Sequence, residues 1–476
     1  MESNKRAFWL IICSIFFGNF LAILSITTVT VAFPVVMDEF NANLSTVQWL
    51  MAGYLLATGI IAPVVGYLGD QLSYKYLYII ALFGFTLFSL FCGLAWDIQI
   101  LILFRIIQGV FGGMIIPITL TIIYQTLERH QQSKAMGLWS LASMLAPVIG
   151  PTFGGWLVDY FGWSAIFFFN LPIGILGIII VSRCIPYYRI GTSQSFDFIG
   201  FISVVASSSL LLFGFSQVGS WGFGSWKTLL LLGSGIILLG FFIRWELRSK
   251  APLLQLSVFK FSQFTYSLII NCIITASMYI GTLLVPLYLQ DVLHLSPMDT
   301  GLIMLPGAIA MAAASPVVGN VYDRIGPFKL VFTGASLVVI STALFSSIGL
   351  ETSAYLIAIY QLIRCIGISL CTVPLTNAGM SAVTRDYSGH ASSITNWARQ
   401  GMASMSIGIF SALVVARSSG YLKSDGTTVT AAISMGISDV FWIGTILAIT
   451  AIPLTFMLRI KSQAKINSAK PKAANQ

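Results

Sequence analysis

Charged residues are scarce in this chain. Asp, Glu, Lys and Arg make up only 9% of its 476 residues, whereas hydrophobic residues make up 57%. A soluble domain of ordinary composition carries about 25% charged residues, and even a large globular domain leaves much of its surface in water. The composition therefore excludes a soluble globular protein and a disordered chain. It also argues against a nucleic-acid-binding protein, in spite of the formal net charge of +9.

Residues that bind metals or form disulfides are also few. The chain has six cysteines and three histidines, His130, His294 and His390. The cysteines have no paired spacing and most lie inside apolar runs, so we interpret them as small buried hydrophobic residues. The histidines stand singly in loops or at helix ends. The sequence thus predicts no metal site, no catalytic residue and no cofactor, and it disfavours an enzyme.

Long apolar runs are what the chain has in abundance. Its mean hydropathy is +0.89, and a membrane-crossing helix needs about 20 apolar residues. The first run, residues 7–33, is too long for a signal-peptide core and predicts a first spanning helix. We predict an all-α membrane protein with fourteen spanning helices, at residues 8–36, 47–68, 76–95, 99–124, 135–158, 164–185, 197–217, 227–246, 263–290, 299–321, 329–349, 353–378, 390–416 and 438–459.

The basic residues indicate how these spans are oriented. If the N-terminus lies in the cytoplasm, 19 of the 25 Lys and Arg residues fall in inner segments and three, Lys227, Arg417 and Lys423, in outer segments. Cytoplasmic loops of membrane proteins carry such an excess of basic residues. We therefore predict a monomeric, multi-pass protein of the cytoplasmic membrane with both termini in the cytoplasm. Its basic tail after Leu458 would meet anionic lipid headgroups.

A short pattern occurs twice, about half a chain apart. The form G-x-x-x-D appears at residues 66–70 and again at 319–323, each time in a predicted cytoplasmic loop. Transporters commonly contain two such halves, with the substrate site near the membrane midplane where the halves meet. We predict an N-terminal six-helix half at residues 1–190, a two-helix insertion at 191–260, a C-terminal six-helix half at 261–460 and a basic cytoplasmic tail at 461–476.

Four motifs, in order along the chain, resemble those of the major facilitator superfamily. Residues 66–70 resemble the family's signature between helices 2 and 3, and residues 105–109 (Arg-Ile-Ile-Gln-Gly) resemble its fourth-helix motif. Residues 150–155 (Gly-Pro-Thr-Phe-Gly-Gly) resemble the antiporter signature of the fifth helix. Trp163, residues 170–174 and the two central extra helices are similar to the fourteen-helix drug:proton antiporters of the EmrB/QacA type. The resemblance covers essentially the whole chain.

The resemblance implies a transporter that exports drugs or other amphipathic small molecules by alternating access, with the proton gradient as its energy source. In the family, the acidic residue of the loop motif latches neighbouring helices, and the fifth-helix motif lets the two halves slide and seal. The small residues of the latter also fit a plain packing seam between helices. The residues so assigned to coupling and gating are Arg105, Gln108, Gly109, Asp70, Asp323, Arg324, Gly150, Pro151, Gly154 and Gly155.

Three arginines, Arg105, Arg364 and Arg399, lie inside predicted spans. An embedded guanidinium is costly and usually faces a cavity or a partner. Arg105 could instead extend to the outer interface, and the other two could bond to backbone carbonyls. The polar residues that we expect in the substrate cavity, besides Arg105 and Gln108, are Asn19, Ser25, Thr28, Tyr54, Asn271, Arg364, Asn396, Arg399 and Gln400.

No carboxylate lies deep in any predicted span, although the chain has 16 acidic residues. The antiporters that it resembles usually carry an aspartate in helix 1 where this chain has Ser25, and a serine cannot carry a proton. Coupling would then use an acid near a helix end, such as Asp38, Asp159 or Asp439, or water near Arg105; otherwise ordinary proton coupling is absent. The alternatives are the same fold exporting or flipping an anionic amphipath, such as a fatty acid or lipid, and a transporter-like sensor.

Overall fold

The computed structural model consists of helices joined by short loops over the residues that it describes. These are residues 2–458 apart from 63, 127–128, 186, 188–195, 223, 250–251, 384–387 and 424–427. Within them, 13 helices are long and apolar enough to cross a membrane, and they coincide with 13 of the predicted spans. The remaining predicted span, 135–158, lies within the 33-residue helix α8 (Arg129–Phe161), in which several side chains are outside the described part of the structure. The predicted all-α membrane fold is confirmed.

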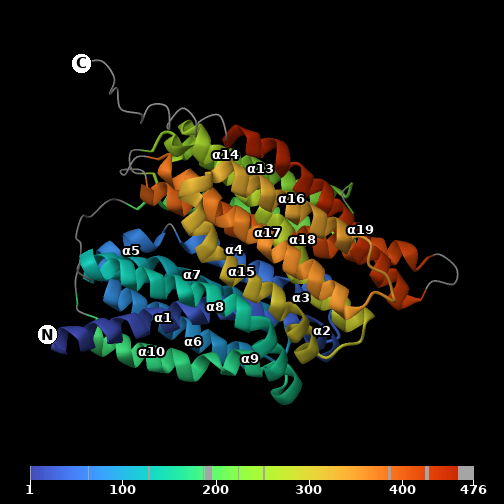
Figure 1. Cartoon of the computed structure of the whole chain (residues 1–476), viewed down its shortest axis with the longest axis horizontal. Coiled ribbons are helices and arrows are strands. Elements are labelled where there is room, and N and C mark those ends of the chain that lie inside the picture. Colours follow the sequence, from blue (N-terminus) through green and yellow to red (C-terminus); the bar gives the residue numbers. More distant parts are fainter. Residues whose placement is uncertain are drawn as a thin grey trace.

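The first ten helices pack together as one bundle (Figure 1, blue to green). Helix α1 lies against α8 and α10, and α7 lies between α4 and α6. Helices suit this environment because lipid offers no partners for free backbone groups. The remaining bounds in this bundle are α1 (Glu2–Val31), α2 (Phe33–Glu39), α3 (Leu44–Val47), α4 (Trp49–Ile61), α5 (Val64–Leu72), α6 (Tyr74–Gly93), α7 (Ile98–Thr126), α9 (Ala165–Phe168) and α10 (Asn170–Cys184).

A second bundle follows later in the chain (Figure 1, yellow to red). Helix α17 packs against α14, α15 and α16, and α18 packs against α14 and α19. Gly326 separates α15 from α16 with a φ of +81°, a conformation that glycine adopts without strain. The helices of this bundle are η1 (Leu256–Lys260), α14 (Ser262–Leu287), η2 (Tyr288–Val292), α15 (Pro297–Ile325), α16 (Pro327–Phe345), α17 (Ala354–Ser381), α18 (Ser388–Tyr421) and α19 (Val429–Ile449).

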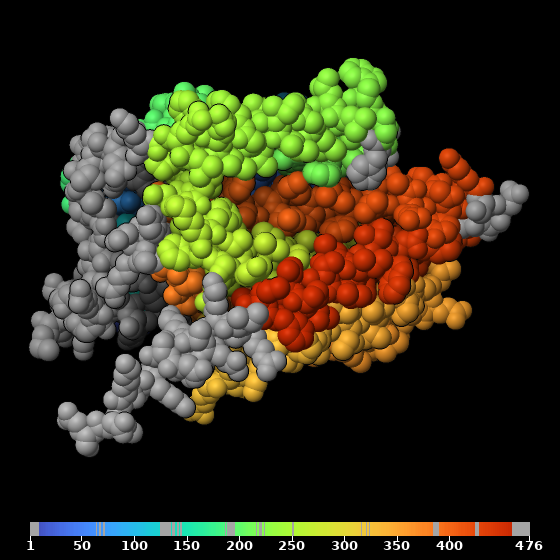
Figure 2. Space-filling view, turned by 90° about the horizontal axis from the view of Figure 1, so that it is seen from above, coloured from blue at the N-terminus to red at the C-terminus, as the bar shows by residue number. Residues whose placement is uncertain are grey.

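A helical hairpin lies between the two bundles in the sequence. It consists of α11 (Phe198–Ser216), the short α12 (Val218–Trp221) and α13 (Trp226–Glu246). Figure 2 shows it in green along one edge of the molecule, and α11 packs against α18 and α4. The predicted division of the chain stays a prediction, because the boundary at residue 190 and the tail 461–476 lie outside the described residues.

The two bundles contact each other closely where α8 meets α15. A Cβ at Gly301 would lie 2.5 Å from the Cα of Thr152, so no side chain fits there. The Thr152 hydroxyl donates to the Gly301 carbonyl at 2.9 Å, and the Met298 amide donates to Asp159 at 2.9 Å. A hydrophobic cluster with residues of both bundles lies at this end of the molecule. The two bundles are therefore closed against each other at the end that we predict to face outward.

The hairpin gives a direct test of the predicted orientation. Lys227 is exposed near the start of α13, and Arg248 is exposed just beyond the other end of that helix. We expect a cysteine at position 227 to react with a membrane-impermeant maleimide added outside intact cells, and a cysteine at position 248 to be protected. The unsubstituted chain, with its six native cysteines, supplies the background. Labelling of position 227 only after the membrane is opened would contradict the orientation.

Candidate functional site

Arg105 lies entirely inside the first bundle, with none of its surface exposed. Its Nε donates to the Leu50 carbonyl of α4 at 3.1 Å, and its Nη1 donates to the Ser25 hydroxyl of α1 at 2.7 Å. Its Nη2 donates to the Ser25 carbonyl at 2.5 Å. The guanidinium also lies 4.0 Å from the centre of the Tyr54 ring. The charge is thus held by backbone dipoles, a hydroxyl and an aromatic face.

The hydrogen bonds of Arg105 continue through a network of neutral side chains. Its Nη1 also donates to Gln108 Oε1 at 2.5 Å, and Gln108 Nε2 donates to the Ser89 hydroxyl of α6. Asn170 of α10 donates to the same hydroxyl at 3.0 Å. The network therefore joins α1, α4, α6, α7 and α10, and no carboxylate takes part in it among the residues described. A shift of α1 relative to α4 would change the partners of a buried charge.

Small residues explain how Arg105 reaches α4. A Cβ at Gly109 would lie 2.7 Å from the Tyr54 carbonyl, and a Cβ at Gly113 would lie 2.5 Å from the Cα of Thr58. Glycines four residues apart on one helix share a face, and their lack of a side chain lets α7 approach α4 closely. This approach brings the Leu50 carbonyl within reach of the guanidinium. The glycine of the fourth-helix motif is therefore part of the structural basis of the arginine site.

A cavity of ≈ 70 Å³ lies where the two bundles meet. Its walls come from α1, α4 and α8 on one side and from α14, α15 and α17 on the other. None of the described residues that line it is acidic. Its polar side chains include threonines, Tyr279, Gln361, Arg364 and Cys365, and its apolar side chains include four flexible methionines. The threonines are Thr27, Thr30 and Thr282, and the methionines are Met51, Met278, Met304 and Met311.

Arg364 is the charged residue of this cavity, with 2% of its surface exposed. Its Nε donates to Gln361 Oε1 at 3.1 Å, and its Nη1 donates to the carbonyls of Ser277 at 3.3 Å and Met278 at 3.2 Å. A Cβ at Gly281 would overlap the guanidinium, so glycine makes room for it. Its Nη2 has no hydrogen-bond partner among the described residues. Arg364 can therefore offer a positive charge and free N–H groups to an occupant of the cavity.

Several predicted cavity residues of the first bundle lie in its interior instead of lining this cavity. Asn19 donates to the Trp139 carbonyl at 3.2 Å, and the Tyr54 hydroxyl donates to the Ala22 carbonyl at 3.2 Å. Thr28 donates to the Leu24 carbonyl within its own helix at 3.1 Å. Ser25 is occupied by Arg105. The structure thus gathers Ser25 and Tyr54 around Arg105 and places Asn19 and Thr28 at helix contacts.

The predicted residues of the second bundle are also dispersed. Asn271 borders a small cavity of ≈ 10 Å³ within that bundle. Gln400 of α18 donates to the Thr58 hydroxyl of α4 at 2.9 Å and so joins the two bundles. Asn396 is half-buried, and Arg399 is exposed. Of the predicted cavity residues, Arg364 is the one that lines the cavity between the bundles. The sequence analysis did not predict the four methionines of the cavity, because one apolar residue in a spanning helix cannot be told from another by its sequence.

The predicted gating residues of α8 lie at two helix contacts. Gly150 faces Thr27, and a Cβ at Gly154 would lie 2.9 Å from the Cα of Thr28, so α8 approaches α1 closely. Gly155 and Pro151 lie instead at α15 of the second bundle. The fifth-helix motif therefore contacts two helices. These are α15, at the closed end between the bundles, and α1, which carries Ser25.

The predicted latch residues lie near the ends of α5 and α15. The side chains of Asp70 and Asp323 are outside the described part of the structure, and Arg324 is exposed. Their latch role stays a prediction.

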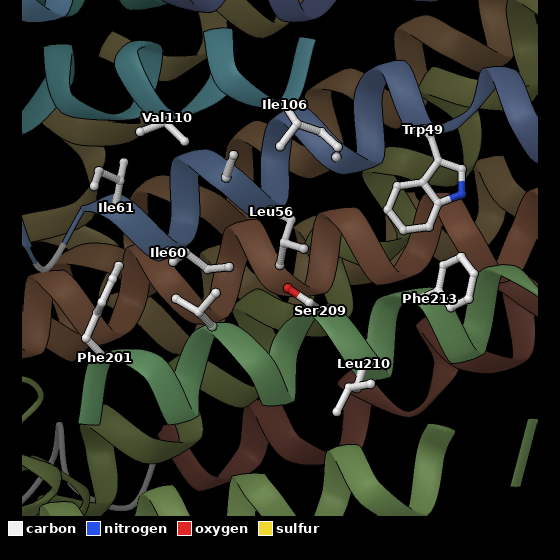
Figure 3. A pocket seen from close by; sticks show the side chains of 13 residues that line it. Trp49, Leu56, Ile60, Ile61, Ile106, Val110, Phe201, Ser209, Leu210 and Phe213 are labelled. Carbon is white, nitrogen blue, oxygen red and sulfur yellow. The ribbon is translucent and has the colours of Figure 1, made fainter. Parts of the chain in front are cut away.

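A larger pocket of ≈ 570 Å³ lies on the other side of α4, between α4, α7 and α11. Figure 3 shows Trp49 and Phe213 at one end of it and Ile61 and Phe201 at the other. Ser209 is its one polar lining residue; the others are apolar or glycine. The hairpin therefore completes an apolar chamber at membrane depth, and apolar residues of this kind gave no signal in the sequence.

Comparisons with known proteins agree with this architecture. The family model of the Major Facilitator Superfamily matches residues 15–409. The MFS-type transporter YcnB of Bacillus subtilis is 31% identical, covering 93% of each chain, and the lincomycin resistance protein LmrB of Listeria monocytogenes is 28% identical, covering 94% of this chain and 96% of its own.

Solved structures show the same fold. A bacterial homologue of the human lysosomal transporter Spinster, in an inward-facing, unoccupied conformation, superposes with a TM-score of 0.69 at 13% identity, covering 95% of this chain and 97% of its own. A POT family transporter in complex with 5-aminolevulinic acid has the same TM-score, with 96% of each chain covered. Taken with the family match, these likenesses show that the chain belongs to the major facilitator superfamily and is a multi-pass membrane transporter, not an enzyme.

Proposed function

We propose that this transporter exports amphipathic small molecules from the cytoplasm across the cytoplasmic membrane by alternating access in exchange for protons. The observation that carries the proposal is the cavity between the two bundles, because its walls come from both of them. A rocking motion of one bundle against the other would expose such a cavity first to one side of the membrane and then to the other. The lipid bilayer surrounds the transporter, and both termini lie in the cytoplasm.

The chemistry of the cavity supports amphipathic substrates. Methionine side chains are flexible and polarizable and suit binding surfaces that accept varied apolar shapes. The threonines and Gln361 add hydrogen-bonding groups, as in pockets that orient a largely apolar ligand by a few polar contacts. Some relatives are named for resistance to drugs, among them LmrB and a multidrug resistance protein B homologue of Mycobacterium tuberculosis that is 30% identical over 332 residues.

A second candidate function is the movement of an anionic amphipath by the same cycle. It is favoured by Arg364, which lines the cavity and whose Nη2 has no protein partner among the described residues. No carboxylate among the described lining residues neutralises this charge. A carboxylate or phosphate group of a substrate would supply the missing acceptor.

Reconstitution into proteoliposomes with an imposed pH gradient tests the proposal. We expect at least one member of a panel of cationic, neutral and anionic amphipaths to move against its own gradient, and a protonophore to stop this movement. Empty liposomes control for passive leakage. Transport that ignores the pH gradient would remove proton exchange from the proposal. Binding of a compound without its transport would favour the transporter-like sensor.

A further inference from the structure

Two carboxyl groups, one partly exposed and one buried, lie close together at one end of the helical hairpin. Asp197 immediately precedes α11 and accepts a hydrogen bond from the Gly200 amide at 2.8 Å. Glu246 ends α13 and has only 3% of its surface exposed. A Cβ at Gly200 would lie 2.7 Å from Asp197 Oδ2 and 2.7 Å from Glu246 Oε1. The two carboxyl oxygens are therefore no farther apart than twice that distance.

Hydrogen-bond donors are distributed unequally between these two groups. Asp197 accepts from the Gly200 amide, and the Trp245 indole N–H lies 2.9 Å from Oδ1 and 3.0 Å from Oδ2. Glu246 accepts through Oε2 from the Leu254 amide at 3.2 Å, whereas its buried Oε1 has no partner among the described residues. Donors of this kind stabilise the ionised form of a carboxyl group. Hydrogen-bond donors therefore surround Asp197, whereas Glu246 Oε1 has none among the described residues.

The described surroundings supply no cation to balance a second negative charge. Arg244 and Arg248 of the α13 segment are exposed, and so is Lys260 of η1. On α18, His390 Nδ1 accepts a hydrogen bond from the Gln255 amide at 3.4 Å. None of these four forms an ion pair with Asp197 or Glu246 in the described part of the chain. Two neighbouring carboxylates without a counter-ion repel each other, and such pairs commonly share one proton.

We propose that Glu246 holds a proton on Oε1, the oxygen on the Asp197 side of its carboxyl group, which makes this pair a proton-binding site of the transporter. The proton comes from water and is returned to water when the site opens. The inference stands apart from the proposed export function, since it rests on the geometry of the hairpin alone. The middle of the predicted spans contains no acid, and this carboxyl pair lies outside that region.

The position of the site connects it to the second bundle. Glu246 accepts a hydrogen bond from the Leu254 amide. The Leu254 side chain is buried in a hydrophobic cluster with Val204 and Phe242 of the hairpin and with residues of η1, α14 and α18. Loss of the proton would place two repelling charges where α11, α13 and this linker meet. The hairpin would then be less firmly attached to the bundle that follows it.

Infrared spectroscopy of the full chain in lipid vesicles tests the protonation directly. We expect the wild type to show a carbonyl band of a protonated carboxyl group that disappears as the pH is raised. The variant Glu246→Gln should lack this band, because its amide cannot titrate. The variant Glu351→Gln removes an exposed carboxyl group instead and should retain it. Retention of the band in Glu246→Gln, or its absence from the wild type at every pH, would overturn the proposal.

Thermal unfolding provides a second measurement that does not depend on the band. A glutamine keeps the shape and the neutral charge of protonated glutamic acid. Because the folded protein must release the proton at high pH, we expect the wild-type midpoint to fall as pH rises. The unfolding midpoint of Glu246→Gln should match that of the wild type at low pH. It should not show the decrease with rising pH that proton release from Glu246 causes in the wild type. If Glu246→Gln lowers the midpoint at every pH as much as Glu246→Ala does, the site requires the ionised carboxylate and the assignment is wrong.

Discussion

The variant Arg105→Ala is expected to lose transport while it still inserts into the membrane and folds. The change removes the hydrogen bonds that Arg105 makes to α1, α4 and Gln108. A hydrogen bond to a charged group contributes about 1.5–3 kcal/mol, which is roughly ten- to a hundredfold in an equilibrium constant. The Leu50 and Ser25 carbonyls lie within helices, so the helices themselves should persist. Initial rates in proteoliposomes at matched protein density measure the effect.

Two further variants separate the role of the fork-shaped guanidinium from that of the charge. Arg105→Lys keeps the charge but lacks the planar set of five donors, so we expect only partial recovery of transport. Arg183→Ala removes an exposed arginine at the end of α10 and should transport like the wild type. Full transport by Arg105→Ala at normal abundance would rule out a coupling role for this residue.

The sequence could predict the spanning helices, because a bilayer leaves no other hydrogen-bonded structure for an apolar run. The ends of the helices were harder to predict from the sequence. The last span was expected to begin at residue 438, yet α19 begins at Val429, since a helix can continue beyond its most apolar stretch. The span at 135–158 could be predicted although it contains Gly and Pro, and the structure adds that its glycines let α8 pack closely against α1 and α15.

Arg105 could be singled out from the sequence because an arginine in an apolar run is conspicuous, but its partners could not. Two of its acceptors are the backbone carbonyls of Leu50 and Ser25, and every residue has such a group. The sequence showed that Ser25 stands where an acid is usual in similar antiporters. The structure adds that Ser25 bonds the guanidinium directly. An aspartate at this position would therefore meet Arg105 instead of the open cavity.

The direction in which each polar residue faces was beyond the reach of the sequence. Lipid and the protein interior are both apolar, so hydropathy does not distinguish a cavity-facing side from a helix contact. Asn19 and Arg364 are both polar groups in spans, yet Asn19 bonds a neighbouring helix and Arg364 lines the cavity. Close packing between helices decides this, as at Gly281, where the absence of a side chain leaves space for the guanidinium.

Substrate charge is expected to follow from this arginine. The described residues of the cavity lining include Arg364 and no acid, so a dication entering the cavity would lose water without gaining a carboxylate. Moving an unpaired charge out of water costs several kcal/mol. We therefore expect anionic, zwitterionic or neutral amphipaths to be transported well and dicationic dyes poorly. Monovalent lipophilic cations should fall between these classes, since aromatic faces can bind them. Efflux of a dicationic dye at the rate of a neutral amphipath would contradict the expectation.

Replacing Arg364 should change this selectivity more than it changes overall activity. In Arg364→Met, transport of an anionic amphipath should fall at least about tenfold, because one charge-assisted hydrogen bond is worth about 1.5–3 kcal/mol. Transport of a neutral amphipath of similar size should stay near the wild-type rate. Gly281→Ala keeps the charge but places a methyl group where the guanidinium lies, so it should reproduce the selective loss. Equal losses for the anionic and the neutral compound in both variants would show that Arg364 supports the fold of the cavity and does not bind the anion.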